Sequence, residues 1–227
     1  MYDKRILLFL DILGFKDFIK NRTQPEVLKV LEKIKSLDGT KDYQPSRRVT
    51  QFSDCLCISY DHNEQSNVFD LISDIEFLII DLIQQDTLVR GAITFGELHH
   101  DDKFIFGPAL NNAYELESKI IKYPAVTLSD DIVGLARNFP GSAHDGAWEE
   151  DFIKQGLLEL PTDQHTYWFI NYLSKIRLLA IGVQPNDLNS YKLRLQKIIN
   201  NGLNNPCQKI VDKYSWLQTQ LNKNWNL

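Results

Sequence analysis

Hydrophobic and polar positions follow two different periods along the chain, and each change of period marks an expected element. Residues 6–10 form an uninterrupted apolar run, which is typical of a central strand buried on both faces, and Asp11 ends it. Residues 16–37 then repeat apolar positions at helical spacing, with Pro25 forcing a break. We therefore expect a buried strand, a turn and then helices.

The two periods continue to alternate up to about residue 137. Residues 49–60 alternate as a hairpin that turns at Ser53 and Asp54, and residues 68–83 carry the longest amphipathic helix. The later segments predict a strand at 88–98, a return strand at 104–106, a helix opened by Gly107 and Pro108, a strand at 125–128, and a helix capped by Ser129.

A segment rich in Gly, Pro and Asn, at residues 138–146, follows this unit. With this segment begins a C-terminal extension, residues 138–227, which we expect to pack on residues 1–137. The extension should be mostly helical, with helices from about residue 188 onward. The fold class is thus α+β, with two regions.

The composition of the 227 residues excludes several classes of protein. The chain is 43% hydrophobic, enough for a cooperative core, and its net charge of −5 argues against a general nucleic-acid binder. Apolar runs fall far short of the roughly 20 residues that span a bilayer, and the N-terminal run is too short for a signal peptide. Three cysteines, an odd number, favour reduced thiols. We expect a cytoplasmic protein that binds neither membrane nor nucleic acid.

The charges are unevenly distributed along the sequence. Residues 1–60 carry a net charge of +3, residues 61–165 carry −14, and residues 166–227 carry +6. The basic residues of the last block are spaced as on a helix without interleaved aromatic residues, so we interpret them as a solvated helix face. They include Lys192, Arg194, Lys197, Lys209, Lys213 and Lys223.

Two aspartates carry the candidate chemistry. If the strands before Asp11 and around Asp54 are neighbours, both carboxylates lie at one edge of the sheet, where such a pair can hold two Mg²⁺ or Mn²⁺ ions about 3.5–4 Å apart. The backbone N–H groups of the turn at residues 12–15, including Gly14 and Phe15, could receive a triphosphate. Aspartates at strand ends are also common turn formers, so spacing alone leaves both interpretations open.

Four motifs occur in a fixed order. They are Phe9-Leu10-Asp11-Ile12-Leu13-Gly14-Phe15, Phe52-Ser53-Asp54, Arg90-Gly91-Ala92-Ile93-Thr94-Phe95-Gly96 and Phe106-Gly107-Pro108-Ala109-Leu110-Asn111-Asn112-Ala113. Their order and spacing resemble class III nucleotidyl cyclases over roughly residues 5–137, and the long extension is similar to the bacterial pyrimidine cyclases of Pycsar antiphage systems. The resemblance implies a ferredoxin-like, palm-type sheet flanked by helices, with residues 1–137 as the catalytic domain.

The resemblance also implies roles for individual residues. Asp11 and Asp54 match the metal ligands, with the Ile12 carbonyl as a further ligand for two Mg²⁺ or Mn²⁺ ions. Arg90 matches the arginine that contacts the triphosphate, and Asn111 matches the asparagine that reaches the ribose from the partner subunit. A head-to-tail homodimer with composite active sites follows from the same family pattern.

Departures from the family pattern concern the base. Purine cyclases place a lysine or glutamate where this chain has Thr50, and an aspartate or cysteine where it has Phe104. A hydroxyl that reaches a ring edge and an aromatic face that stacks on it suit a pyrimidine, although both residues could equally belong to the core. The resemblance thus implies that UTP, less favourably CTP, is cyclised to the 3′,5′-nucleotide, a second messenger for a cyclic-nucleotide-responsive effector.

A second departure concerns catalysis itself. Most class III cyclases carry a transition-state arginine where this chain has Glu115. Either Glu115 turns away into a salt bridge and another cation substitutes, or the chain is a weak or inactive cyclase-like module that binds nucleotide without turnover. The cations considered as substitutes are Arg47, Arg48, Lys119 and Lys122.

Overall fold

The computed structural model describes residues 2–37 and 44–225. Up to residue 138 the elements follow the order expected from the periodicities, whereas the two strands within residues 157–170 were not predicted. The elements are β1 (Asp3–Ile12), α1 (Phe15–Asn21), α2 (Gln24–Lys35), β2 (Arg48–Phe52), β3 (Cys55–Asp61), α3 (Asn67–Ile83), β4 (Val89–His100), β5 (Ile105–Phe106), α4 (Pro108–Glu115), the π-helix η2 (Leu116–Ile120), β6 (Val126–Leu128), α5 (Asp131–Asn138), α6 (Gly146–Gln155), β7 (Leu157–Pro161), β8 (Thr166–Ile170), α7 (Lys175–Ala180), α8 (Pro185–Leu203) and α9 (Gln208–Trp225).

Within the described residues the strands form one eight-stranded sheet in the order β2-β3-β1-β4-β6-β8-β7, with β5 paired to β4. Strand β1 lies between two antiparallel neighbours, β3 and β4, and residues 6–10 are buried, as the apolar run predicted. Its register places Asp11 opposite Arg90 on β4 and opposite Cys55 on β3. Because directly opposed residues in a sheet share a face, this register brings the three side chains together.

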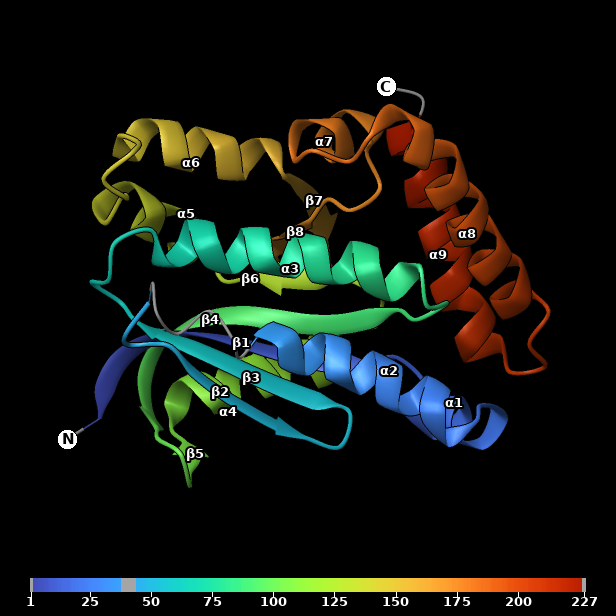
Figure 1. The fold of residues 1–227 in the computed structure, drawn as a ribbon, viewed down its shortest axis with the longest axis horizontal. Helices are drawn as coiled ribbons and strands as arrows, with labels where there is room; N and C mark the ends of the chain where they lie inside the picture. The colour runs from blue at the N-terminus through green and yellow to red at the C-terminus, as the bar shows by residue number, and fades with distance from the viewer. Residues whose placement is uncertain (1, 38–43, 226–227) are drawn as a thin grey trace.

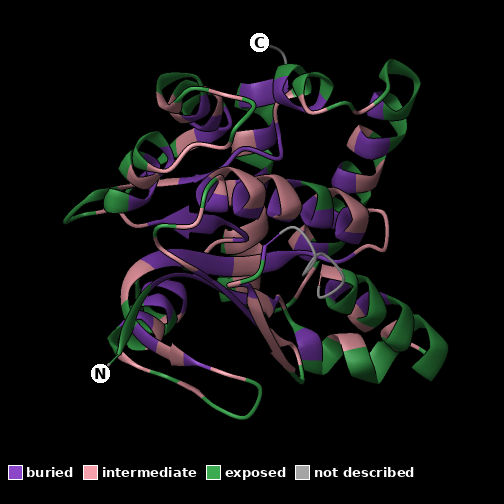
Figure 2. Cartoon of the chain, turned by 60° about the vertical axis from the view of Figure 1, so that its left-hand side comes forward, coloured by how far each residue is buried: buried purple, intermediate pink, exposed green. Residues whose placement is uncertain are grey.

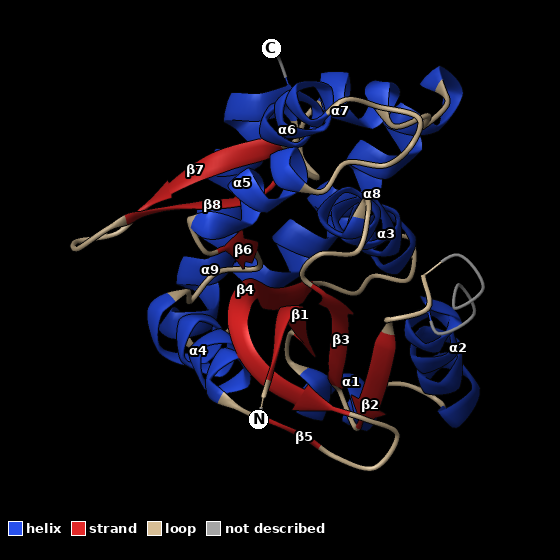
Figure 3. Cartoon of the chain, turned by 90° about the vertical axis from the view of Figure 1, so that its left-hand side faces the viewer, coloured by secondary structure: helices blue, strands red, loops and turns tan. Residues whose placement is uncertain are grey.

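Helices cover both faces of the sheet (Figure 1). Helices α2 and α3 lie on one face, whereas α4 and α9 lie on the other, as the view in Figure 3 shows. The first face packs the larger apolar core, and the second packs a smaller one that includes Leu7, Phe9 and Cys57 under Ala109 and Ala113 of α4. Purple, buried segments run through the central strands in Figure 2, and green, exposed segments lie on the outer turns of the helices.

The sheet continues past residue 137, the expected boundary between the catalytic region and the extension. Strand β6 pairs in parallel with β4, β8 pairs with β6, and β7 closes that edge. A buried ion pair also ties the extension to α3: Arg177 on α7 donates from Nε and Nη2 to Glu76 at 2.7 and 2.8 Å. The division at residue 137 stays a prediction, and it does not coincide with an edge of the sheet.

The last two helices form an antiparallel hairpin at one end of the molecule, beside α1 and the end of α3 (Figure 1). Their side chains Leu195, Ile198 and Leu217 are buried. Arg194 and Lys197 of α8 form ion pairs with Asp86, in the loop before β4, at 3.0 and 3.1 Å. No helix in residues 2–37 and 44–225 combines the length and the apolar character that a bilayer-spanning helix requires.

Candidate active site

Asp11 and Asp54 converge at the end of β1. One carboxylate oxygen of each aspartate and the sulfur of Cys55 all lie within 4.8 Å of one another, and the three residues are half-buried. The turn that carries Asp54 is held against β1, because the Ile12 N–H donates to the Asp54 carbonyl at 3.2 Å. The structure thus brings together the two aspartates that the sequence singled out and places Ile12 beside them.

The electrostatics of this site are dominated by crowded acids. Burial, then Glu117 and Asp54, raise the pKa of Asp11 to about 7, and Arg90 opposes that shift. Burial and the same acids raise the pKa of the Cys55 thiol to about 12. Cys55 is therefore a neutral thiol, placed to donate to Asp11 Oδ1 at 3.9 Å, and not a thiolate ligand for a soft metal. The donor set that remains consists of carboxylate oxygens, which suits Mg²⁺ or Mn²⁺.

Arg90 points into the same cluster. Its Nη2 lies 3.5 Å from Asp11 Oδ2, and its Nε forms an ion pair with Glu117. Glu117 is only 2% exposed, and it is carried by η2, the π-helix that follows α4. Sequence reasoning missed Glu117, because a π-turn shifts side chains off the 3.6-residue period; short π-helices are frequent at functional sites.

The turn after β1 has the shape that its glycine predicts. Gly14 has φ +74°, a left-handed conformation that favours glycine, and Phe15 is buried at the start of α1. The Leu13 N–H donates to the Leu88 carbonyl at 2.9 Å, so this N–H and that of Ile12 are bonded within the fold. A role for Gly14 and Phe15 toward a triphosphate stays a prediction.

The two residues proposed for the base have different surroundings. Thr50 Oγ1 is 2.9 Å from Nε2 of His100, whose Nδ1 lies 2.8 Å from Ser59 Oγ. Burial lowers the pKa of His100 to about 4, so the imidazole is neutral at physiological pH and fixes the Thr50 hydroxyl. Phe104 is 62% exposed between β4 and β5. Thr50 is thus held by the sheet, whereas the Phe104 ring faces solvent.

Helix α4 presents the remaining predicted residues on its surface. Asn111 is exposed, and Glu115 forms an ion pair with Lys119 at 2.9 Å, one helical turn away. Of the alternatives considered for Glu115, the structure has the one in which its side chain forms a salt bridge. Among the cations considered as substitutes, Arg47 is fully buried and pairs with Asp74 at 2.9 Å, so it serves the core. Arg48 donates to the carbonyls of Pro45 and Arg47.

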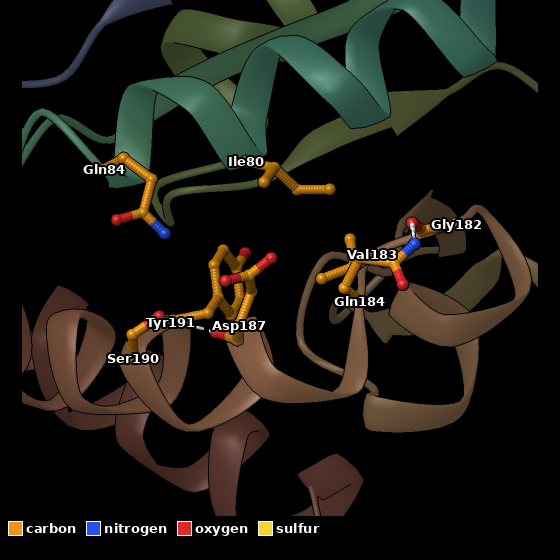
Figure 4. A pocket seen from close by; sticks show the side chains of 8 residues that line it. All are labelled: Ile80, Gln84, Gly182, Val183, Gln184, Asp187, Ser190 and Tyr191. Atoms are coloured by element: carbon orange, nitrogen blue, oxygen red, sulfur yellow. Dashed lines mark hydrogen bonds between the residues drawn. The ribbon is translucent and has the colours of Figure 1, made fainter.

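A separate hollow of about 410 Å³ lies between the C-terminal end of α3 and the α7–α8 loop together with α8, as Figure 4 shows. Ile80 and Gln84 project from α3, and Asp187, Ser190 and Tyr191 line the opposite wall. None of the residues predicted for the active site lines it.

No protein-family model and no curated protein matches the sequence. Among solved structures, the chain is similar to the catalytic core of a rhodopsin-guanylyl cyclase with converted specificity in complex with ATPαS. The two are 15% identical, with a TM-score of 0.52, over 74% of this chain and 96% of that one. It is also similar to the adenylyl cyclase CyaB from P. aeruginosa, at 13% identity, with a TM-score of 0.51, over 75% of this chain and 95% of that one.

A non-canonical dimeric guanylyl cyclase domain of the RhoGC fusion protein from the aquatic fungus Blastocladiella emersonii aligns at 14% identity, with a TM-score of 0.50, over 74% of this chain and 94% of that one. Identities this low establish a common architecture and leave substrate and activity to be argued from the site. The α+β sheet with its flanking helices has the fold of the class III nucleotidyl cyclase catalytic domains.

Proposed function

We propose that this chain is a nucleotidyl cyclase that converts UTP, less favourably CTP, to the 3′,5′-cyclic nucleotide and pyrophosphate. The product would be a second messenger in antiphage defence, acting on a cyclic-nucleotide-responsive effector. The observation that carries the proposal is the convergence of the Asp11 and Asp54 carboxylates within 4.8 Å, with Arg90 opposite Asp11 on the neighbouring strand. The chain shares its fold with guanylyl and adenylyl cyclases, one of them solved in complex with ATPαS, and this supports a nucleotide as the ligand of the site.

The site suits divalent cations on its own chemistry. Burial first, and then repulsion from Glu117 and Asp54, raise the pKa of Asp11 to about 7, and a bound cation would favour the ionised carboxylate. Asp11, Asp54 and the Ile12 carbonyl would hold two Mg²⁺ or Mn²⁺ ions. When bound, such ions lower the pKa of the ribose 3′-hydroxyl and neutralise the triphosphate.

The protein's own groups orient the nucleotide and stabilise developing charge. Arg90 presents a guanidinium fork, whose fixed geometry suits the phosphates of the leaving pyrophosphate. In the structure Glu117 and Asp11 hold that fork, so the triphosphate would compete with Glu117 for it. In a head-to-tail homodimer, Asn111 of the opposing chain would reach the ribose, which accords with its exposed position on α4.

The pyrimidine assignment rests on the two positions that differ from purine cyclases. The Thr50 hydroxyl, oriented by neutral His100, would bond to the edge of a small ring. The exposed ring of Phe104 would stack on the base. The preference for UTP over CTP follows from the resemblance alone.

The test is to incubate the full chain with ATP, GTP, CTP or UTP and Mn²⁺ or Mg²⁺, and to identify products by mass spectrometry. Cyclic UMP as the main product is expected, with activity lost in Asp54→Asn and kept in Asp102→Asn, a change at an exposed aspartate of the β4–β5 tip. Cyclic AMP or cyclic GMP as the main product would refute the pyrimidine assignment. No cyclic product from any nucleotide would refute the activity.

One observation favours a second candidate, a nucleotide-binding module without turnover. Glu115 occupies the position of the family's transition-state arginine, and it forms an ion pair with Lys119, one of the cations considered as a substitute. This alternative predicts that UTP binds with Mn²⁺, in equilibrium dialysis, while no cyclic product forms. Turnover of bound UTP would exclude it.

A further inference from the structure

Helix α9 carries a lysine to the edge of the candidate active site. Lys213 is half-buried and lines a cavity of about 470 Å³. The same cavity is lined by Leu13 and Gly14, the residues that directly follow β1. The cavity therefore connects the C-terminal hairpin with the turn predicted to receive a triphosphate.

Lys213 lies close enough to the acidic cluster for their charges to influence each other. Burial and the positive charge of Arg90 lower the pKa of Lys213, whereas the carboxylates of Glu117 and Asp11 act in the opposite direction. Reciprocally, Lys213 favours the ionised form of Glu117. A lysine that interacts with Arg90, Glu117 and Asp11 is not on the solvated helix face that the sequence pattern indicated.

The position of Lys213 is fixed by packing rather than by a mobile tail. Helix α8 is tied to Asp86 through Arg194 and Lys197, and the ring of Tyr214 packs on the backbone of α8 at Gly202. The same loop accepts hydrogen bonds from Arg22, whose Nη1 donates to the Gln85 carbonyl at 2.8 Å. The hairpin is thereby anchored to the loop that leads into β4 and Arg90.

We propose that Lys213 is a phosphate-binding residue of this site, supplying, from the C-terminal hairpin of the same chain, a second cation beside Arg90 for the triphosphate of the nucleotide. The inference rests on the proposed function and adds a subsite to it. Arg90 and Lys213 are two cations beside the acids Asp11 and Glu117, and a triphosphate bound there with divalent cations would bring negative charge that both can bind. An ammonium binds phosphate as a compact point charge, whichever base the nucleotide carries.

The experiment measures binding of tripolyphosphate, in the presence of Mn²⁺, to the full chain by isothermal titration calorimetry. The variants are Lys213→Met, Lys213→Arg and the matched control Lys209→Met, which changes an exposed lysine one turn earlier on α9. We expect Lys213→Met to weaken binding by about tenfold or more, Lys213→Arg to restore most of the affinity, and Lys209→Met to match the wild type.

Equal affinities for Lys213→Met and the wild type would overturn the proposal, as would a wild-type chain that binds no tripolyphosphate. A purely structural lysine would lower the melting temperature when changed to Met and leave the affinity intact, and that result also counts against it. If Lys213→Met does not fold, Lys213→Gln is compared with Lys209→Gln. The readout is independent of turnover, so a chain that makes no cyclic product fails the proposed function while the affinities still decide the role of Lys213.

Discussion

At the residue scale, Asp11 is held in an environment that opposes its charge. It is partly buried, it faces Glu117 and Asp54, and its partner Arg90 is shared with Glu117. Perturbed carboxylates of this kind gather at functional sites, because the interactions that catalysis needs are unfavourable in the empty protein. Ionised Asp11 therefore lowers the stability of the folded chain, by an amount that depends on pH.

The first prediction at this scale is that Asp11→Asn stabilises the metal-free protein near neutral pH. In the folded chain the pKa of Asp11 is raised from 3.8 to about 7, so the folded state binds a proton at this site more tightly than the unfolded state. Asp11 therefore does not destabilise the protein below pH 4, and the free energy of unfolding falls as the pH rises from 4 toward 7. The increase in the free energy of unfolding caused by Asp11→Asn should therefore be absent at pH 4 and on the order of 2 kcal/mol above pH 7. Thermal unfolding followed by circular dichroism across this range measures it.

Metal binding supplies the control for that variant. Mn²⁺ should raise the melting temperature of the wild type more at pH 8 than at pH 6, because protons compete for Asp11, and should have little effect on Asp11→Asn. Asp102→Asn should behave as the wild type in both measurements. A variant that is less stable than the wild type at pH 8 without metal would contradict the electrostatic account.

Residues differ in how far the sequence could predict their surroundings. Asp11 and Asp54 were identifiable, because a buried strand and a hairpin turn are marked by local patterns. The partner of Thr50 was not, since His100 lies 50 residues away and meets it only across the folded sheet. Glu117 escaped notice because the π-helix rotates it out of the helical period.

At the element scale, the contact between α8 and α9 depends on a glycine. Gly202 lies in the last turn of α8, where an added Cβ would collide with the ring of Tyr214. A helix interior ordinarily disfavours glycine, by about 1 kcal/mol relative to alanine. Its presence here is explained by the close approach of the next helix, which sets the position of Lys213.

Alanine substitutions at two helical glycines should therefore have opposite effects. Gly202→Ala should lower the melting temperature and weaken tripolyphosphate binding, since α9 must move away from α8. Gly134→Ala in α5, where the added Cβ meets open space, should raise stability by roughly 0.5–1 kcal/mol and leave binding unchanged. Differential scanning calorimetry and titration calorimetry give both quantities, and stabilisation by Gly202→Ala would refute the packing argument.

At the scale of the whole molecule, the exposed aromatic residues favour an assembly. Phe52, Phe104 and Phe106 on the β-hairpins and Tyr114 on α4 are between 49% and 62% exposed. Aromatic residues are enriched at protein interfaces, and Tyr114 lies on the same helix as the exposed Asn111. A head-to-tail dimer would cover them and complete the proposed site.

Composite sites predict complementation between inactive variants. Asp11→Asn removes a metal ligand, and Asn111→Ala removes the group supplied by the other chain, so each homodimer should be inactive. Subunits exchanged at equal amounts should recover roughly a quarter of wild-type activity, because half the dimers are mixed and each mixed dimer keeps one intact site. Cyclase assays on the mixture test this, and no recovery despite demonstrated exchange would place the whole site within one chain.

From the sequence we could predict the order of the elements up to about residue 137, the α+β class, and Asp11 and Asp54 as candidate ligands. These follow from local periodicity, turn residues and motifs, which act over a few residues. Only the tertiary structure decided that the sheet runs on through β8 and β7, that Glu117 holds Arg90, and that Lys213 borders the cavity beside Gly14. The physical reason is that strand pairing, burial and charge coupling join residues separated by tens to hundreds of positions, and packing alone selects those partners.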